Sequence, residues 1–406
     1  MKNIFIVALI CSSSFVFAQD FWIPRDSVKG PGKSVASAFV ANGQGYIVAG
    51  LTSNGFVRSM YSYDVNQDDW DDTTSIGGLN GGGLSRGSAC SFSIGNKGYI
   101  CLGQGDNTNY LNDVWEYDPV LDVWSQKANY AGSARRGAVA FVINDIAYVG
   151  TGQDVTGMRK DFYKYDPVTN LWGAIADFGG TARKYAVGFA LGNQGYVGTG
   201  NDGTMRNDFW QYQVFQNTWI QKANFPGSAR EGATGWGVFP DGFIATGEDI
   251  NNSYCNDVWQ YNYFTNAWTQ RTSLPASGRK HAISFMIGHI AYLGTGYNGN
   301  LLDDFYAYDG ITGTGPELNA EQEMNVYPNP CVNSFSIEGK QITPQCGVVI
   351  YDLNGRDVSS AFLCEKSEGK TAVNVISAPE GAYSVVINDR EGELLSVSRV
   401  VIGSQK

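Results

Sequence analysis

The chain has 406 residues, of which 43% are hydrophobic, and a formal net charge of −11. This length and apolar content predict folded domains with buried cores, while the acidic balance and the lack of a basic run argue against nucleic acid and anionic membranes as partners. Only two histidines are present, which disfavours a copper centre or a Ser/His/Asp triad, because each depends on imidazole groups.

The first 18 residues have the pattern of a secretory signal peptide. A basic start at Lys2 precedes an apolar stretch from Ile4 to Phe17, and Ala18 completes a small-residue cleavage site. The stretch is too short to span a membrane, and no other run approaches that length. We therefore expect residues 1–18 to be removed, a mature chain that begins near Gln19, and no membrane span.

From residue 20 to 310, one phrase recurs about every 48 residues. An aromatic-rich apolar run leads into a Gly–Thr–Gly turn, as at Gly150–Gly152, followed by an Asp–aromatic pair, a tryptophan and an arginine. Short β-branched and aromatic runs between Gly, Asn, Asp and Pro predict strands and turns, and a repeat of this period predicts an all-β propeller. The recurring tryptophans are Trp70, Trp124, Trp172, Trp219 and Trp268.

The sixth unit, residues 280–310, contains three strands but lacks the fourth strand and its tryptophan. The segment Phe21–Arg25, with Trp22, aligns with the fourth strand of the fourth unit around Trp219. We therefore expect the N-terminal segment to complete the last blade. The ring then has six blades and leaves no sheet edge open.

The repeats resemble kelch repeats. The resemblance rests on the small-residue turn, on the Asp–aromatic third strand, such as Asp113–Asp118 and Asp161–Asp166, and on the tryptophan that follows. It covers roughly residues 20–310, and Gly–Thr–Gly stands where many kelch repeats carry a Gly–Gly pair. It implies a kelch propeller over residues 19–311, related in fold to galactose oxidase, and it fixes no single function.

A different domain follows a Gly/Pro/acidic linker at residues 312–324. Residues 325–406 contain alternating apolar strands joined by Asn–Gly-type turns, which predict a small Ig-like β-sandwich. The order of its phrases, beginning with Val326–Pro330 and Val348–Arg356, resembles the C-terminal sorting domain of the type IX secretion system of Bacteroidota. The resemblance implies export through the periplasm to the cell surface or medium, with the secretion machinery as partner. The alternative is an ordinary adhesive domain.

One arginine per unit stands in the loop that enters the innermost strand, and these loops share one face of the propeller. Guanidinium groups suit carboxylates, sulfates and phosphates, so one hypothesis places an anionic ligand against them at the axial mouth. The alternative is that each arginine pairs with an acid of the neighbouring blade and holds the ring together. The candidate ligand-binding residues are Arg86, Arg135, Arg183, Arg230 and Arg279.

Cys90 and Cys101 lie symmetrically about the Gly95–Asn96 turn. The two side chains should face each other across a hairpin, where either a disulfide or two separate thiols would fit the expected oxidising compartment.

These observations favour a secreted or surface kelch propeller that binds a glycan or a protein at its mouth, without catalysis, cofactor or metal. His281 and His289 are expected roughly 20 Å apart, too far to share a metal. An alternative is an enzyme on acidic sugars, because the repeats are similar to kelch-type sialic-acid epimerases. Glu231, Glu248 and His281 are then the candidate acid/base residues. A third interpretation is a structural or adhesive surface protein.

Overall fold

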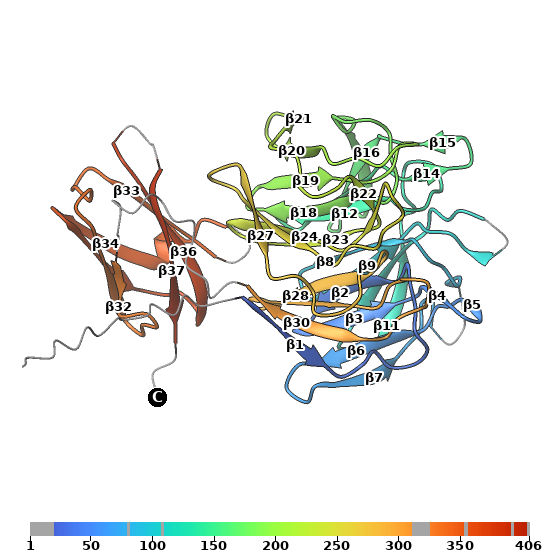
Figure 1. Cartoon of the computed structure of the whole chain (residues 1–406). Coiled ribbons are helices and arrows are strands. Elements are labelled where there is room, and N and C mark those ends of the chain that lie inside the picture. The colour runs from blue at the N-terminus through green and yellow to red at the C-terminus, as the bar shows by residue number, and fades with distance from the viewer. Residues whose placement is uncertain are drawn as a thin grey trace, which may run out of the picture.

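The computed structural model describes residues 20–78, 82–106, 109–310, 325–352, 356–390 and 394–403. The expected signal peptide and the expected linker, residues 312–324, lie outside these ranges. Residues 20–310 form a β-propeller, and a smaller β-domain follows it (Figure 1). The fold is therefore all-β, as predicted.

Six four-stranded antiparallel sheets form the blades of the propeller. The first three blades contain β2 (Ser37–Ala41), β3 (Gln44–Val48), β6 (Met60–Asp64) and β7 (Asp69–Thr73); β8 (Cys90–Ile94), β9 (Lys97–Cys101), β10 (Val114–Asp118) and β11 (Val123–Lys127); and β12 (Val139–Ile143), β13 (Ile146–Gly150), β16 (Phe162–Asp166) and β17 (Leu171–Ile175). The fourth and fifth contain β18 (Val187–Leu191), β19 (Gln194–Gly198), β20 (Phe209–Gln213) and β21 (Thr218–Gln221); and β23 (Thr234–Val238), β24 (Asp241–Ala245), β26 (Val258–Asn262) and β27 (Ala267–Arg271).

The sixth blade joins the two ends of the propeller and confirms the predicted closure. Its strands are β28 (Ile283–Ile287), β29 (Ile290–Gly294), β30 (Phe305–Asp309) and β1 (Phe21–Arg25). Trp22 of β1 stands opposite Tyr308 of β30, and its indole N–H donates to the carbonyl of Thr272 in the fifth blade at 3.0 Å. The innermost strands β2, β8, β12, β18, β23 and β28 contact one another in turn around a complete circle.

The repeated aromatic residues hold the blades against each other. Each fourth-strand tryptophan donates its indole N–H to a backbone carbonyl of the preceding blade, as Trp124 does to Thr74 at 2.8 Å. The cores lie between blades: Phe39 and Tyr46 of the first blade pack with Tyr117 and Trp124 of the second. The periodic tryptophans and tyrosines are therefore residues that pack the blades together. A single blade, with both faces apolar, has no stable form alone.

Three short two-stranded sheets lie on one face of the propeller, two of them hairpins and the third a pair of strands distant in the chain. They pair β4 (Leu51–Thr52) with β5 (Gly55–Phe56), β14 (Gln153–Asp154) with β15 (Gly157–Met158), and β22 (Arg230–Glu231) with β25 (Glu248–Asp249). We call this side the upper face. Figure 1 shows β4, β5, β14 and β15 on the side of the propeller away from the C-terminal domain.

The C-terminal domain is a sandwich of two antiparallel sheets. One contains β31 (Asn325–Tyr327), β32 (Ser334–Glu338), β35 (Lys370–Val375) and β34 (Phe362–Ser367); the other contains β33 (Gly347–Tyr351), β36 (Gly381–Asn388) and β37 (Leu394–Ile402). Buried side chains of both sheets, including Phe335, Ile337, Ile350 and Val385, form its core. The domain contacts the first hairpin of the fifth blade, where the Tyr351 ring lies 4.9 Å from that of Phe239.

Candidate functional site

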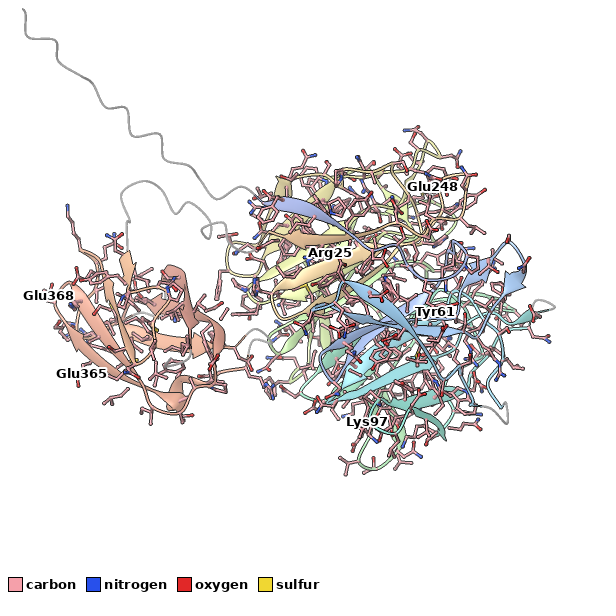
Figure 2. All side chains as sticks on the ribbon, turned by 90° about the horizontal axis from the view of Figure 1, so that it is seen from below. Arg25, Tyr61, Lys97, Glu248, Glu365 and Glu368 are labelled. Carbon is pink, nitrogen blue, oxygen red and sulfur yellow. The ribbon has the colours of Figure 1, made fainter. Side chains whose placement is uncertain are left out.

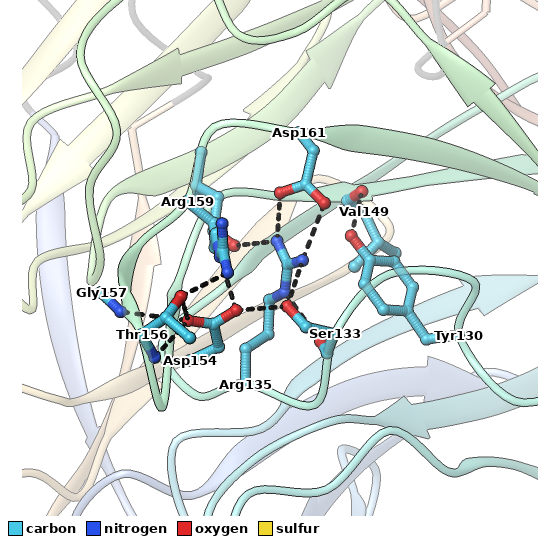
Figure 3. Close-up of polar contacts among 10 residues, drawn as sticks. Tyr130, Ser133, Arg135, Val149, Asp154, Thr156, Gly157, Arg159 and Asp161 are labelled. Atoms are coloured by element: carbon cyan, nitrogen blue, oxygen red, sulfur yellow. Dashed lines mark hydrogen bonds and ion pairs between the residues drawn. The ribbon is translucent and has the colours of Figure 1, made fainter.

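The five periodic arginines lie inside the blades, and their side chains are at most 1% exposed. Each guanidinium group donates to both carboxylate oxygens of an aspartate that precedes the third strand. In the third blade, Arg135 bonds Asp161 at 2.6 and 2.8 Å and also reaches the carbonyls of Thr151 and Ser133 (Figure 3). The five clamps are Arg86–Asp113, Arg135–Asp161, Arg183–Asp208, Arg230–Asp257 and Arg279–Asp304.

These contacts correct the expectation that the periodic arginines bind a ligand. Their donors are already occupied and the side chains are hidden from solvent, so the structural alternative describes them. That alternative is itself corrected in one respect: the paired acid belongs to the blade that the arginine enters, and not to its neighbour. Burial alone raises the pKa of Asp208, but the bonds and charge of Arg183 and the Trp210 indole outweigh it, so that this pKa is lowered.

The residues two places after the five arginines, together with Val35, which stands two places after Lys33, form a ring around the propeller axis. All six such residues have positive φ, between 48° and 62°. Each backbone N–H donates to the carbonyl of the equivalent residue in the preceding blade, at 2.7 to 3.3 Å, and the sixth bond closes the circle. We call this ring the collar; it consists of Val35, Ser88, Gly137, Tyr185, Gly232 and His281. Left-handed backbone at residues such as Val35 is costly and persists only where the surroundings compensate for it.

Two collar side chains close the centre of the ring. The Tyr185 and His281 rings meet edge to face at 4.6 Å, and the Tyr185 hydroxyl lies 3.2 Å from that of Ser88. Glycine at positions 137 and 232 leaves room for them, because an added Cβ would stand 2.8 Å from the Tyr185 or the His281 ring. The collar and the alanines beside it line a cavity of about 110 Å³.

Three of the residues between a clamp arginine and the collar carry cationic side chains at the upper face. Arg136 donates to Gln104 at 2.5 Å, and the Lys184 ammonium donates to Gln153 at 3.0 Å. The ammonium of Lys280 donates to Glu248 at 2.6 Å. All three cations are partly exposed, and all three lower the pKa of His281. We call this surface the upper mouth; it consists of Arg136, Lys184, Lys280, Glu231 and Glu248.

The three candidate acid/base residues all lie at or beside the upper mouth. Glu231 and Glu248 face each other in the β22–β25 pair, and Figure 2 shows Glu248 on the side away from the C-terminal domain. One carboxylate oxygen of Glu231 is buried with no hydrogen-bond partner among the described residues. Burial and the charges of Lys280, Lys184 and Arg136 lower the pKa of His281 to about 3. Its imidazole is therefore uncharged near neutral pH and a weak base.

In each basic pair, the arginine named from the sequence is the buried member and the residue that follows it is partly exposed. Arg136, Lys184 and Lys280 each follow a clamp arginine directly, and adjacent residues in extended backbone point to opposite sides. The signal was present, because the arginine recurs in five units while the next residue changes from Gly87 to Glu231 and others. Variation within a fixed repeat marks positions that packing does not dictate.

Cys90 and Cys101 stand opposite each other in the β8–β9 ladder, as the turn position suggested. Their sulfur atoms lie 3.3 Å apart, and both residues are buried and present as free thiols. We expect the exported protein to carry a disulfide here. Intact mass spectrometry of protein from the culture medium should then show a loss of two hydrogens relative to the reduced form, and a Cys90→Ser variant should show none. Equal masses before and after reduction would contradict this prediction.

Over the ranges that the structure describes, no group of three His, Cys, Asp or Glu side chains is arranged to hold a metal ion. A search of the same ranges finds no helix with the length and apolar character needed to cross a membrane.

Comparison with known proteins agrees with this architecture. The family model of the KLHDC2/KLHL20/DRC7 Kelch-repeats domain matches residues 36–239, and that of the Secretion system C-terminal sorting domain matches residues 325–402. The solved structure of YjhT shares 20% identity and a TM-score of 0.58, over 70% of this chain and 96% of its own, a likeness that shows a common fold. A search of curated proteins gives no match. The chain belongs to the KLHDC2/KLHL20/DRC7 Kelch-repeats domain family, and its C-terminal sorting domain marks it as a secreted or cell-surface kelch protein.

Proposed function

We propose that the upper mouth binds the anionic group of a glycan or protein ligand, and that the propeller acts as a non-catalytic binding module. The observation that carries this proposal is the convergence of Arg136, Lys184 and Lys280 on one partly exposed surface around the axis. Charge-assisted hydrogen bonds to carboxylate, sulfate or phosphate are stronger than neutral ones, and the acidic remainder of the protein steers anions away from other surfaces.

The mouth is suited to a ligand that carries polar groups beside its anion. The side-chain amides of Gln104 and Gln153 lie within reach of Arg136 and Lys184, and they offer both donors and acceptors to hydroxyl groups. The aromatic ring of Tyr254 lies 6.0 Å from the Lys280 ammonium, where it can pack against an apolar ligand face. An acidic sugar combines these features, as does a carboxylate-bearing peptide.

A second candidate function is catalysis on an acidic sugar, and the state of Glu231 favours it. Glu231 has a buried carboxylate oxygen without a hydrogen-bond partner. Its negative charge also acts on Lys184: it raises the pKa of that lysine, although burial and Arg136 lower this pKa more strongly. A carboxylate with one oxygen free of hydrogen bonds, beside a binding site, is a candidate general base. Glu248 and His281 are weaker candidates, because Lys280 pairs with the first and the imidazole of the second is a poor base.

A glycan array that contains neutral and acidic sugars tests the binding proposal on the whole chain. We expect selective binding to acidic glycans, and a loss of about tenfold or more in Arg136→Ala/Lys184→Ala, since a hydrogen bond to a charged group contributes about 1.5–3 kcal/mol. The matched control is Lys29→Ala/Lys160→Ala, which removes two exposed cations elsewhere. Equal loss in both variants would show that only net charge matters and would contradict the site.

Two further outcomes separate the other interpretations. Turnover of a bound sugar, detected by NMR and lost in Glu231→Gln while binding persists, would replace the binding module by an enzyme. No glycan binding by a folded propeller would contradict the glycan ligand, and a pull-down with the same two variants would then decide between a protein ligand and a structural or adhesive role.

A further inference from the structure

Lys33 occupies the sixth arginine position of the ring. It stands two residues before collar residue Val35, and its carbonyl accepts from Gly296 at 2.8 Å, just as the Arg86 carbonyl accepts from Gly50 at 2.9 Å. In the first blade the residue before the third strand is Ser59, where the other blades have the clamp aspartate. The first blade therefore has a cation in the clamp position without its carboxylate.

The Lys33 side chain is as buried as the clamp arginines, with 1% of the residue exposed. Its ammonium lies 4.4 Å from the centre of the Tyr61 ring, and it has no hydrogen-bond partner among the described residues. Figure 2 labels Tyr61 on the N-terminal part of the propeller. A buried ammonium group that retains its charge is costly without a counter-charge and acceptors, and an aromatic face provides only part of this compensation.

The clamp position of the first blade also holds smaller side chains than in the other blades. Lysine and serine together have several fewer side-chain atoms than arginine and aspartate, and the backbone around them repeats that of the other blades. Burial lowers the pKa of Lys33 to about 8, so most of the amine is still protonated at neutral pH. In the other blades an aspartate supplies the negative charge that balances the arginine, as Asp161 does for Arg135 (Figure 3). In the first blade the negative charge that balances Lys33 has to come from elsewhere.

We propose that Lys33, in the blade where Ser59 occupies the position of the clamp aspartate, binds a small inorganic anion such as chloride in the place of the missing carboxylate. The site is independent of the upper mouth and would serve the closure of the ring. The backbone of Lys33 already joins the first blade to the sixth through Leu302 and Gly296, at 3.0 and 2.8 Å. A bound anion would strengthen the same junction that β1 completes.

Thermal unfolding of the whole chain in sodium chloride and in sodium gluconate, at equal ionic strength, tests this proposal. A ligand that binds only the folded state raises the ratio of folded to unfolded protein about tenfold for each tenfold rise in concentration above its Kd. We expect a chloride-dependent rise in Tm for the wild type, and none for Ser59→Asp, which supplies the carboxylate, or for Lys33→Met, which removes the cation.

Two results would overturn the proposal. The Tm of the wild type could be the same in chloride and in gluconate, or it could rise with chloride equally in wild type and Ser59→Asp. If Lys33→Met fails to fold, crystals soaked in bromide provide a second measurement on the wild type. An anomalous peak within hydrogen-bond distance of the Lys33 Nζ atom supports the site, and its absence with bromide bound elsewhere contradicts it.

Discussion

Arg183→Ala should lower the free energy of unfolding by about 3 kcal/mol, the lower end of the range for a buried ion pair broken on one side. The substitution leaves the Asp208 carboxylate with the Trp210 indole, at 2.8 Å, as its remaining side-chain partner. The lower end applies because the Asp208 side chain keeps 21% exposure. The guanidinium bond to the Thr199 carbonyl, at 2.8 Å, is lost as well. Urea unfolding followed by tryptophan fluorescence measures the change.

Two other variants give this prediction its controls. Arg206→Ala breaks the ion pair with Asp202 on the surface, where the arginine side chain is 44% exposed, and should cost at most about 1 kcal/mol. The double replacement Arg183→Met/Asp208→Leu removes both charges together and should cost much less than Arg183→Ala, since no buried charge remains unpaired. Equal stabilities for Arg183→Ala and Arg206→Ala would contradict the clamp.

Trp22→Ala should detach β1 and open the ring, at a cost of about 3 kcal/mol for the lost packing of the indole. The indole packs 4.7 Å from the Tyr308 ring and bonds Thr272 in the fifth blade. Without β1, strand β30 becomes an open sheet edge. In the intact ring, β1 pairs with residues 305–309 of β30. The backbone amides of these residues should therefore exchange hydrogen faster in the variant.

Trp172→Ala is the matched control for ring closure. The substitution removes the equivalent indole from β17, together with its hydrogen bond to the Ala128 carbonyl at 3.0 Å. Strand β17, unlike β1, is continuous in the chain with the rest of its blade. It should destabilise the propeller without selective exchange at residues 305–309. Unchanged exchange at residues 305–309 in Trp22→Ala would contradict the closure.

Sequence alone predicted the architecture because its causes are local and repeated. Turn residues, alternating strands and the spacing of the tryptophans specify one blade, and repetition specifies the ring. The missing fourth strand of the sixth blade then identified Phe21–Arg25 as its complement. The contact of Tyr351 with Phe239 could not be predicted in this way, because it joins two different domains. It also involves a hairpin turn that departs from the Gly/Asn pattern of the other five blades.

The periodic arginines lie in the loops where the sequence placed them, but their side chains are buried inside the blades. Periodicity shows that Arg183 matters, but not whether it points inward or outward, and the structure turns it toward Asp208. Glu231 and His281 are departures from the repeat, and Glu248 lies in a loop between a second and a third strand on the same face. The collar itself could not be predicted, since its positive φ values at residues such as Val35 follow from six backbone bonds between blades and not from residue preference.

The adjacent pair Arg183 and Lys184 provides the most direct test of the upper mouth as the ligand site. Calorimetric titration of the acidic glycan with the strongest array signal should give a Kd weakened about tenfold or more in Lys184→Ala, with Tm close to that of the wild type. Arg183→Ala, measured below its lowered Tm, should retain the wild-type Kd. The reverse result, with affinity lost in Arg183→Ala and kept in Lys184→Ala, would contradict the assignment of the upper mouth as the ligand site.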